Sequence, residues 1–325
     1  MLYVTNNGSF QMAAAGMGLT EGLKMSKVAA FKRVKKSGEW LRWMAKGVCE
    51  ASGMTVPKPD FLGDHDVIMV DASDECVKGS RHSDYRLHYE FDLFNFQCKS
   101  MEVTGIDEGE KLGRYSVNEK QIMMGDRIYC TITGIEHIIG QQGNYVLRFK
   151  SKAFNLYDEG GKKLELLGMF RHLKAYESID VHCHYQLPGG QMRPIRIVAM
   201  KKDAKAIEES KRKMMRKASK KQEKPVQEDT LELNEYVVLA TNLEYTNAQV
   251  LELYRARWQI EQVFNRLKSL FGYGDTPCKR DDTARAWFYG KLLLAALCET
   301  ILARVSFPPK LEPFLLDIVG AQFMG

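Results

Sequence analysis

The sequence YRARWQIEQVFNRLK, residues 254–268, places one carboxylate, Glu261, among hydroxyl and cationic groups. An α-helix turns about 100° per residue, so with Tyr254 at about 0° the side chain of Arg257 falls at about 300°. Glu261 and Lys268 then fall at about 340° and about 320°. The four side chains are therefore predicted to form one narrow stripe. Such a stripe suits a site that holds a metal ion and a phosphate together, and it equally suits a solvated helix face with an i,i+4 ion pair.

The composition predicts a cytoplasmic globular protein. The 325 residues are enough for two or three domains, and the 45% apolar content can form a substantial core. The chain has no run of 18 apolar residues and no charged segment followed by an apolar one at its start. We therefore expect neither a membrane span nor a secretory signal. Seven scattered cysteines without a CxxC pair indicate reduced thiols.

The positive charge is concentrated in one segment. Residues 201–224 contain eleven Lys and Arg against four Asp and Glu, a local balance of +7 in a chain whose net charge is +6. This concentration favours an acidic polymer as a partner, with backbone contact to DNA as one interpretation. An ordinary solvated helix face remains the other interpretation.

Residues 1–60 have the pattern of a helical region. Ser26 and Ser37 are plausible N-cap residues, because each opens a segment of helix formers with Lys and Arg. The arrangement is compatible with a DNA-reading helix-turn-helix or with a simple helical hairpin that has a basic outer face.

The rest of the chain alternates between strand-like and helix-like segments. Apolar or alternating runs predict strands at 67–73, 86–94, 101–106, 121–126, 144–150 and 236–243, with short β-like pieces and glycine turns over 151–200. Helices are predicted at 115–121, 131–140, 201–221, 246–270 and 283–305, the last as an apolar core helix. This order predicts an α/β fold in which helices pack on a mixed sheet.

Two further carboxylates, Asp71 and Asp126, each end an apolar strand-like run. Strand ends gather chemistry in such sheets, although an Asp at this position also caps turns and helices. Asp74 is a second candidate near Asp71, but the apolar strand leads directly into Asp71. Three converging carboxylates need compensation, which Mg²⁺ with its preference for hard oxygen ligands supplies. Arg257 and Lys268 would then hold phosphates near the metal ions, Arg as a bidentate donor and Lys as a point charge.

The stretch 254–268 fits the pattern Tyr-x2-Arg-x3-Glu-x6-Lys, which resembles the signature of the insertion-sequence-4 family of bacterial DDE transposases. Asp71 within VDASD and Asp126 within GDRIY are similar to the first and second catalytic Asp of that family. The resemblance covers roughly residues 26–300. It implies a ribonuclease-H-like mixed sheet with flanking helices, interrupted by a β-rich insertion between Asp126 and Glu261.

The resemblance also implies roles for the site residues. Asp71, Asp126 and Glu261 would be the catalytic metal ligands for two Mg²⁺ ions, with Mn²⁺ as a substitute. Tyr254, Arg257 and Lys268 would contact double-stranded DNA at the transposon end. The implied reaction is metal-dependent cleavage at the end followed by transfer of the 3′-hydroxyl to target DNA, performed by a homodimer in a synaptic complex. The implied location is the bacterial cytoplasm, in association with the nucleoid.

On this interpretation the chain has four parts. They are a helical, DNA-binding-like region at 1–60, a first catalytic part at 64–150, a β-rich insertion at 151–235 with the basic helix, and a second catalytic part at 236–325. The region ahead of GSFQMAAAGMGL looks shortened for the family. Two alternatives therefore stay open: a truncated, non-catalytic DNA-binding relative that inhibits an intact transposase, and a metal-dependent nuclease without strand transfer.

Overall fold

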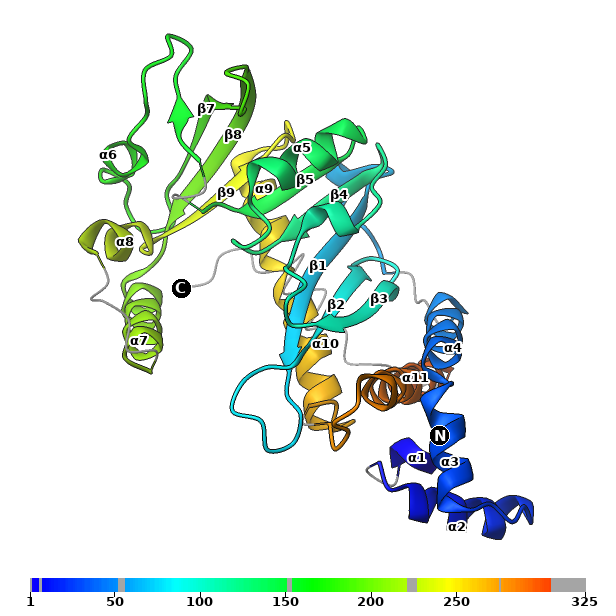
Figure 1. Ribbon diagram of the computed structural model, residues 1–325. Helices are drawn as coiled ribbons and strands as arrows, with labels where there is room; N and C mark the ends of the chain where they lie inside the picture. Colours follow the sequence, from blue (N-terminus) through cyan, green and yellow to red (C-terminus); the bar gives the residue numbers. More distant parts are fainter. Residues whose placement is uncertain are drawn as a thin grey trace. The chain divides into compact units, whose positions relative to one another are not determined.

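Two compact units make up the chain in the computed structural model, which describes residues 2–5, 8–51, 56–150, 154–220, 227–274 and 276–304 (Figure 1). The first unit combines residues 1–110 with 256–325, and the second unit is residues 111–255. The chain thus leaves the first unit after Glu110 and returns to it at Ala256.

The first unit contains an antiparallel sheet in the order β3-β2-β1. Its strands are β1 (Asp66–Glu75), β2 (Tyr85–Asp92) and β3 (Gln97–Gly105). The apolar run Val67–Val70 is buried, and after it the burial alternates along β1. The register places Asp71 opposite Tyr89. The three strands predicted for this part of the chain are confirmed, with ends that differ by a few residues.

Some helices of the first unit contact this sheet, and others form the N-terminal region (Figure 1). Ser26 caps its helix as predicted, because its hydroxyl accepts a hydrogen bond from Ala29 N at 3.1 Å. The Ser37 hydroxyl instead donates to Val34 O at 2.9 Å, at the end of the preceding helix. The helices of the first unit are α1 (Leu2–Thr5), α2 (Phe10–Glu21), α3 (Lys27–Lys35), α4 (Gly38–Ala51), α10 (Trp258–Ser269) and α11 (Asp281–Arg304), with a short 3₁₀ turn η1 (Asp60–Leu62).

Helices α10 and α11 make the main packing contacts of the returning chain. Phe264 of α10 meets the ring of Tyr89 edge-on, with the ring centroids 5.8 Å apart. Helix α11 packs along α4, and its Tyr289 hydroxyl accepts a hydrogen bond from Val103 N of β3 at 3.0 Å. The predicted core helix 283–305 is therefore confirmed over α11, while Val305 lies outside the described residues.

The second unit contains a mixed sheet in the order β4-β5-β9-β8-β7-β6. The pair β4–β5 is parallel and is joined through α5, as parallel neighbours require, and the other pairs are antiparallel. The strands are β4 (Gln121–Gly125), β5 (Asn144–Arg148), β6 (Leu156–Tyr157), β7 (Ser178–Gln186), β8 (Met192–Lys201) and β9 (Tyr236–Thr241). Strands of the predicted insertion thus bond directly to β9, and the division into catalytic parts and insertion stays a prediction.

The helices of the second unit are α5 (Ile132–Gly140), α6 (Leu166–Phe170), α7 (Ala204–Lys220), α8 (Glu228–Leu233) and α9 (Asn247–Arg255), with a 3₁₀ turn η2 (Leu112–Arg114). Helix α7 is the predicted basic helix. It begins after Asp203, whose carboxylate accepts a hydrogen bond from Ala206 N at 2.8 Å. Residues 221–224 of the basic segment lie outside the described residues.

Two predicted helices are wrong. Residues 115–120 are not helical, because a polar turn forms there: Asn118 Oδ1 accepts from Lys120 N at 3.0 Å. The single helix predicted at 246–270 is two helices, α9 and α10, separated at Ala256 and Arg257. At the start of α10, Gln259 N donates to Ala256 O at 3.0 Å, an i→i+3 bond that belongs to a turn rather than to a continuous α-helix.

In the described part of the chain, no helix combines the length and the apolar character that crossing a membrane requires.

Candidate active site

Asp71 lies on β1 directly after the buried apolar run, at the place predicted for the first carboxylate. Its Oδ1 accepts a hydrogen bond from Ala72 N at 2.9 Å. Its Oδ2 lies 3.8 Å from Arg257 Nη1. The side chain is 18% exposed, so the carboxylate is partly shielded from water but still reachable. Asp74 forms a different pair, with Arg86 Nε at 2.7 Å.

Arg257 brings Asp71 and Glu261 to one guanidinium group. While Nη1 faces Asp71, Nη2 donates to Glu261 Oε1, one turn further along α10. The predicted i,i+4 contact between Arg257 and Glu261 is therefore present. It is more than a solvated pair, because a third group from β1 joins it. The guanidinium thus places one positive charge between the two carboxylates.

The donor atoms of this cluster are of the kind that Mg²⁺ takes. Asp71 and Glu261 offer hard carboxylate oxygens, and a divalent ion commonly uses one or two carboxylates together with phosphate oxygens. Glu261 is half exposed, which leaves its second oxygen reachable from solvent. Within each unit, the described residues contain no group of three or more His, Cys, Asp or Glu side chains arranged to hold a metal ion. A metal ion held by Asp71 and Glu261 would therefore need further oxygen ligands.

Lys268, at the other end of α10, contacts a carboxylate that the sequence interpretation missed. Its Nζ lies 3.2 Å from Glu75 Oε1, and the same oxygen accepts a hydrogen bond from Ser73 Oγ at 2.7 Å. Glu75 is 3% exposed. Burial raises the pKa of its carboxyl, while the contacts with Ser73 and Lys268 act in the opposite direction. The signal in the sequence was the alternation Asp71, Ser73, Glu75, which places three side chains on one face of a strand.

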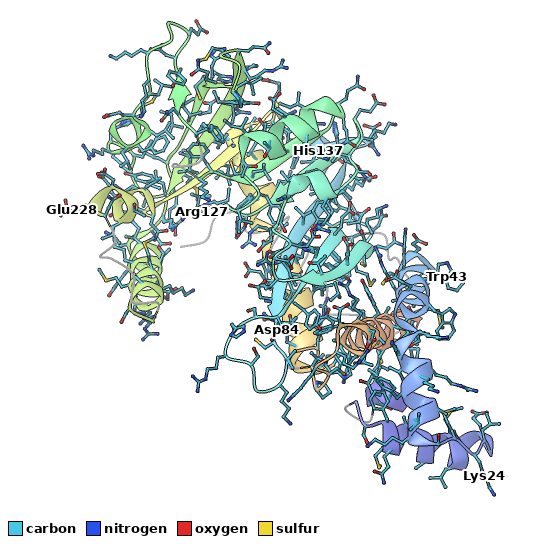
Figure 2. All side chains as sticks on the ribbon, in the orientation of Figure 1. Lys24, Trp43, Asp84, Arg127, His137 and Glu228 are labelled. Carbon is cyan, nitrogen blue, oxygen red and sulfur yellow. The ribbon has the colours of Figure 1, made fainter. Side chains whose placement is uncertain are left out.

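Asp126 belongs to the second unit and follows β4. Its Oδ1 accepts a hydrogen bond from Ile128 N at 2.7 Å, and its main-chain carbonyl accepts one from Tyr129 N at 3.3 Å. Arg127, the next residue, is labelled in Figure 2. Asp126 thus organises the turn that leads toward α5, as Asp residues often do. Its joining with Asp71 and Glu261 in one triad stays a prediction.

Tyr254 also belongs to the second unit, near the end of α9. Its neighbours Val250, Leu251 and Leu253 are buried, whereas Tyr254 is half-buried. The predicted stripe of four side chains assumed one continuous helix. Within the first unit, Arg257 contacts Asp71 and Glu261, and Lys268 contacts Glu75. The place of Tyr254 in the stripe stays a prediction.

Part of the positive charge of the basic segment is used inside the second unit. Lys211 Nζ lies 2.6 Å from Glu235 Oε1. Lys202 Nζ donates to Asn234 O at 2.5 Å, and burial lowers the pKa of Lys202 to about 8. Exposed cations on α7 remain, namely Lys205, Arg212, Lys213 and Arg216. The number of charges that α7 offers to a partner is therefore smaller than the sequence count suggests.

Comparisons with known proteins identify the family of the chain. The family model of the transposase DDE domain matches residues 62–297. InsL of Escherichia coli K12, assigned as the transposase of insertion sequence element IS186A, is 25% identical over 319 residues, which cover 95% of this chain and 85% of InsL. The transposase for insertion sequence element IS421 of Escherichia coli is 25% identical over 295 residues, which cover 88% of this chain and 78% of that transposase.

Among solved structures, the catalytic domain of human endonuclease V covers 72% of this chain and 98% of its own length, at 9% identity and a TM-score of 0.28. A similarity this low supports no argument. The family model, in contrast, spans well over half of the sequence and includes Asp71, Asp126 and Glu261. The chain belongs to the family of transposases with a DDE domain.

Proposed function

We propose that this DDE transposase, an enzyme that acts on DNA, is of the insertion-sequence-4 type and cuts DNA at the ends of an insertion sequence. The freed 3′-hydroxyl then attacks target DNA. The observation that carries the proposal is the guanidinium of Arg257, which contacts Asp71 from β1 and Glu261 from α10. Two carboxylates distant in the sequence meet there beside a phosphate-binding cation.

The proposed metal ligands are Asp71, Asp126 and Glu261, with two Mg²⁺ ions and with Mn²⁺ as a substitute. The oxygen donors of Asp71 and Glu261 fit such ions. When bound, a pair of divalent ions supplies charge stabilisation for the attacking and leaving oxygens of a phosphodiester. The structural support for Asp126 is its position directly after β4, at the end of an apolar strand.

The remaining proposed roles concern DNA. The planar guanidinium of Arg257 can bind two phosphate oxygens at once, while the ammonium of Lys268 acts as a point charge. The hydroxyl of Tyr254 contacts the same strand of DNA as these two cations. The parallel β4–β5 pair and the flanking helices are compatible with a ribonuclease-H-like arrangement. As in the family that the sequence resembles, we propose that a homodimer holds two double-stranded ends in one synaptic complex.

The test is a single-turnover cleavage assay on a labelled DNA duplex. The duplex carries the terminal repeat found in the DNA on either side of this gene. With Mg²⁺, the variants Asp71→Asn, Asp126→Asn and Glu261→Gln should each lose cleavage and keep affinity for the duplex. Asp74→Asn is the matched control, because Asp74 lies on the same strand but pairs with Arg86. Cleavage at the wild-type rate in any of the three variants would remove that residue from the site.

The same assay separates the proposal from its alternatives. A nuclease without strand transfer would release cut ends without joining them to target DNA. A non-catalytic relative would bind the duplex without cutting it, even as wild type. Joined products that need Mg²⁺ and all three carboxylates are the result that supports transposition.

A further inference from the structure

We propose that Glu75, supported by Ser73, is a positioning residue that fixes Lys268 for its contact with a DNA phosphate. The inference rests on the proposed function, because that function assigns Lys268 to DNA. It adds a carboxylate that is neither one of the three proposed metal ligands nor part of the sequence signature.

The environment of Glu75 is unusual for a carboxylate that serves only as a surface partner. The side chain is 3% exposed at the end of β1. Burying a charge is costly unless the charge is paired and hydrogen-bonded, and here both conditions are met on one oxygen. Ser73 Oγ donates to Oε1 at 2.7 Å and Lys268 Nζ lies 3.2 Å from it. Glu75 is therefore held in one place by its own strand before it meets the lysine.

Lys268 is held by Glu75 and is still accessible from solvent. Its side chain is 44% exposed although its partner is buried. An ammonium group has three N–H donors, so a bond to Glu75 leaves two for phosphate oxygens. A free lysine side chain loses much rotamer freedom when it binds, and a preorganised one has lost part of it already. The contact with Glu75 thus prepares Lys268 for a phosphate without consuming its capacity to bind one.

The strand and the helix are connected at two points, which sets a distance between the two parts of the site. Asp71 meets Arg257, and four residues further along β1 Glu75 meets Lys268. Four residues of strand span about 13 Å. The eleven residues from Arg257 to Lys268 span about 16 Å of helix. Lys268 is thereby held at a defined distance from Asp71, as a phosphate contact near a cleavage site requires.

Stability alone does not account for the pair. An ion pair that buries a carboxylate adds little to stability compared with apolar side chains of the same volume. The core beneath α10 already contains buried apolar residues at Ile260, Val263 and Leu267. Burial raises the pKa of Glu75 although the contacts with Ser73 and Lys268 lower it, so the charged form is not favoured by its surroundings alone. The buried carboxylate of Glu75 is therefore explained by its effect on Lys268, which it positions for a DNA phosphate.

The test is a double-mutant cycle with Glu75→Gln and Lys268→Ala, read out by single-turnover end cleavage and by binding to DNA of unrelated sequence. Gln keeps the shape of Glu and can still accept the Ser73 bond. Far-UV circular dichroism and thermal unfolding check that each variant is folded. Glu232→Gln is the matched control, because it breaks the exposed Arg171–Glu232 pair of the second unit (2.7 Å). Its cleavage should equal that of the wild type.

Glu75→Gln should slow cleavage by roughly tenfold, while binding to unrelated DNA stays equal or becomes slightly tighter because a negative charge is removed. The double variant should be no slower than Lys268→Ala, since Glu75 acts through Lys268. Glu75→Asp, whose shorter side chain keeps the charge, should recover part of the rate.

Three results would overturn the inference. Wild-type cleavage by Glu75→Gln, with Lys268→Ala impaired, would overturn it alone and leave the proposed function standing. Losses that multiply in the double variant would show that Glu75 acts independently of Lys268. Wild-type cleavage by Lys268→Ala would remove Lys268 from the DNA contacts, and would overturn the inference together with that part of the proposed function.

Discussion

Asp71 on β1 and Arg257, the residue directly before α10, lie 3.8 Å apart, measured from Oδ2 to Nη1. The contact joins the strand that leaves the N-terminal region to the helix through which the chain returns to the first unit. Because the same guanidinium reaches Glu261, it is the positive charge that two proposed metal ligands share.

Replacing Arg257 with Ala should make the folded protein more dependent on divalent metal. Without the guanidinium, Asp71 and Glu261 lose a common partner, and a bound ion becomes the main source of compensation. When a chelator removes the metal ion, we expect the free energy of unfolding of the variant to be lower than that of the wild type by about 1 kcal/mol. The difference is small because Glu261 is half exposed and solvent screens the pair. Thermal unfolding with and without Mg²⁺ measures the effect. An identical Mg²⁺-induced shift for wild type and variant would contradict it, and Arg257→Lys should fall between the two.

Glu90 should make stability depend on pH. Burial raises the pKa of Glu90 to about 7, an effect that Asp92 strengthens and that Lys99 and Lys46 weaken. An acid whose pKa is raised in the folded state contributes full stability below its unfolded pKa of about 4.3. That contribution is lost as the pH rises to about 7.

The matching variant is Glu90→Gln. Its free energy of unfolding should fall less than that of the wild type between pH 4 and pH 7, by on the order of 3 kcal/mol. Urea unfolding at several pH values provides the measurement. The exposed Glu39→Gln serves as control and should follow the wild-type profile. If the stability profiles of the wild type and of the Glu90→Gln variant run parallel over this pH range, burial does not raise the pKa of Glu90.

Arg196 should be needed to hold the segment that leads into α9. It is 8% exposed, and its guanidinium donates to Leu243 O at 2.8 Å and to Asn247 Oδ1 at 2.7 Å. Its Nε also lies 3.2 Å from Asp180 Oδ2. Arg196→Met removes these bonds and leaves buried acceptors unpaired, so a loss of roughly 3–5 kcal/mol is expected.

Chemical denaturation measures the cost of Arg196→Met, and amide hydrogen exchange shows where it acts. Faster exchange should concentrate at the start of α9. Arg193→Met is the control, because Arg193 is 40% exposed on the same strand. If Arg196→Met lowers the free energy of unfolding no more than the control does, the buried hydrogen bonds of Arg196 contribute no more to stability than the contacts of a surface arginine.

Gly143 should not tolerate a side chain. It lies between α5 and β5, and its N–H donates to Ile138 O at 3.0 Å. A Cβ atom at this position would overlap with Val117 Cγ1 and would approach Ile138 Cγ2 to 3.1 Å. Gly143→Ala should therefore cost about 1–3 kcal/mol of stability. Gly140→Ala is the control: no atom lies within 4 Å of its Cβ position, and it should stabilise α5 by about 0.5–1 kcal/mol. Urea unfolding of the pair would contradict the packing argument if both changed stability alike.

The sequence predicted most strands correctly because their signal is local. The run from Val67 to Val70 is buried, as its apolar pattern requires, and the cap at Ser26 needs only its own neighbours. The break between α9 and α10 could not be predicted in this way. Ala256 and Arg257 are good helix formers with no glycine or proline nearby, and the break coincides with the boundary between the two units.

The candidate site was predictable in its chemistry and less so in its contacts. The pairing of Arg257 with Glu261 follows from helical spacing, whereas its contact with Asp71 depends on how α10 packs on β1. Glu75 was missed because acidic residues usually lie on the surface, and the alternation that places it beside Asp71 and Ser73 does not by itself indicate burial. The chain offered Asp74 and Glu75 side by side, and only the strand's alternation decides which one faces α10.

The alternation along β1 limits how this protein can change in evolution. Asp71, Ser73 and Glu75 share a face because each is two residues from the next. A single residue inserted after Ala72 would leave Asp71 in place and turn Glu75 to the opposite face of the sheet. Lys268 would then lose its carboxylate although no functional residue had been replaced. The stretch from 71 to 75 should therefore keep its length as strictly as it keeps Asp71, Ser73 and Glu75.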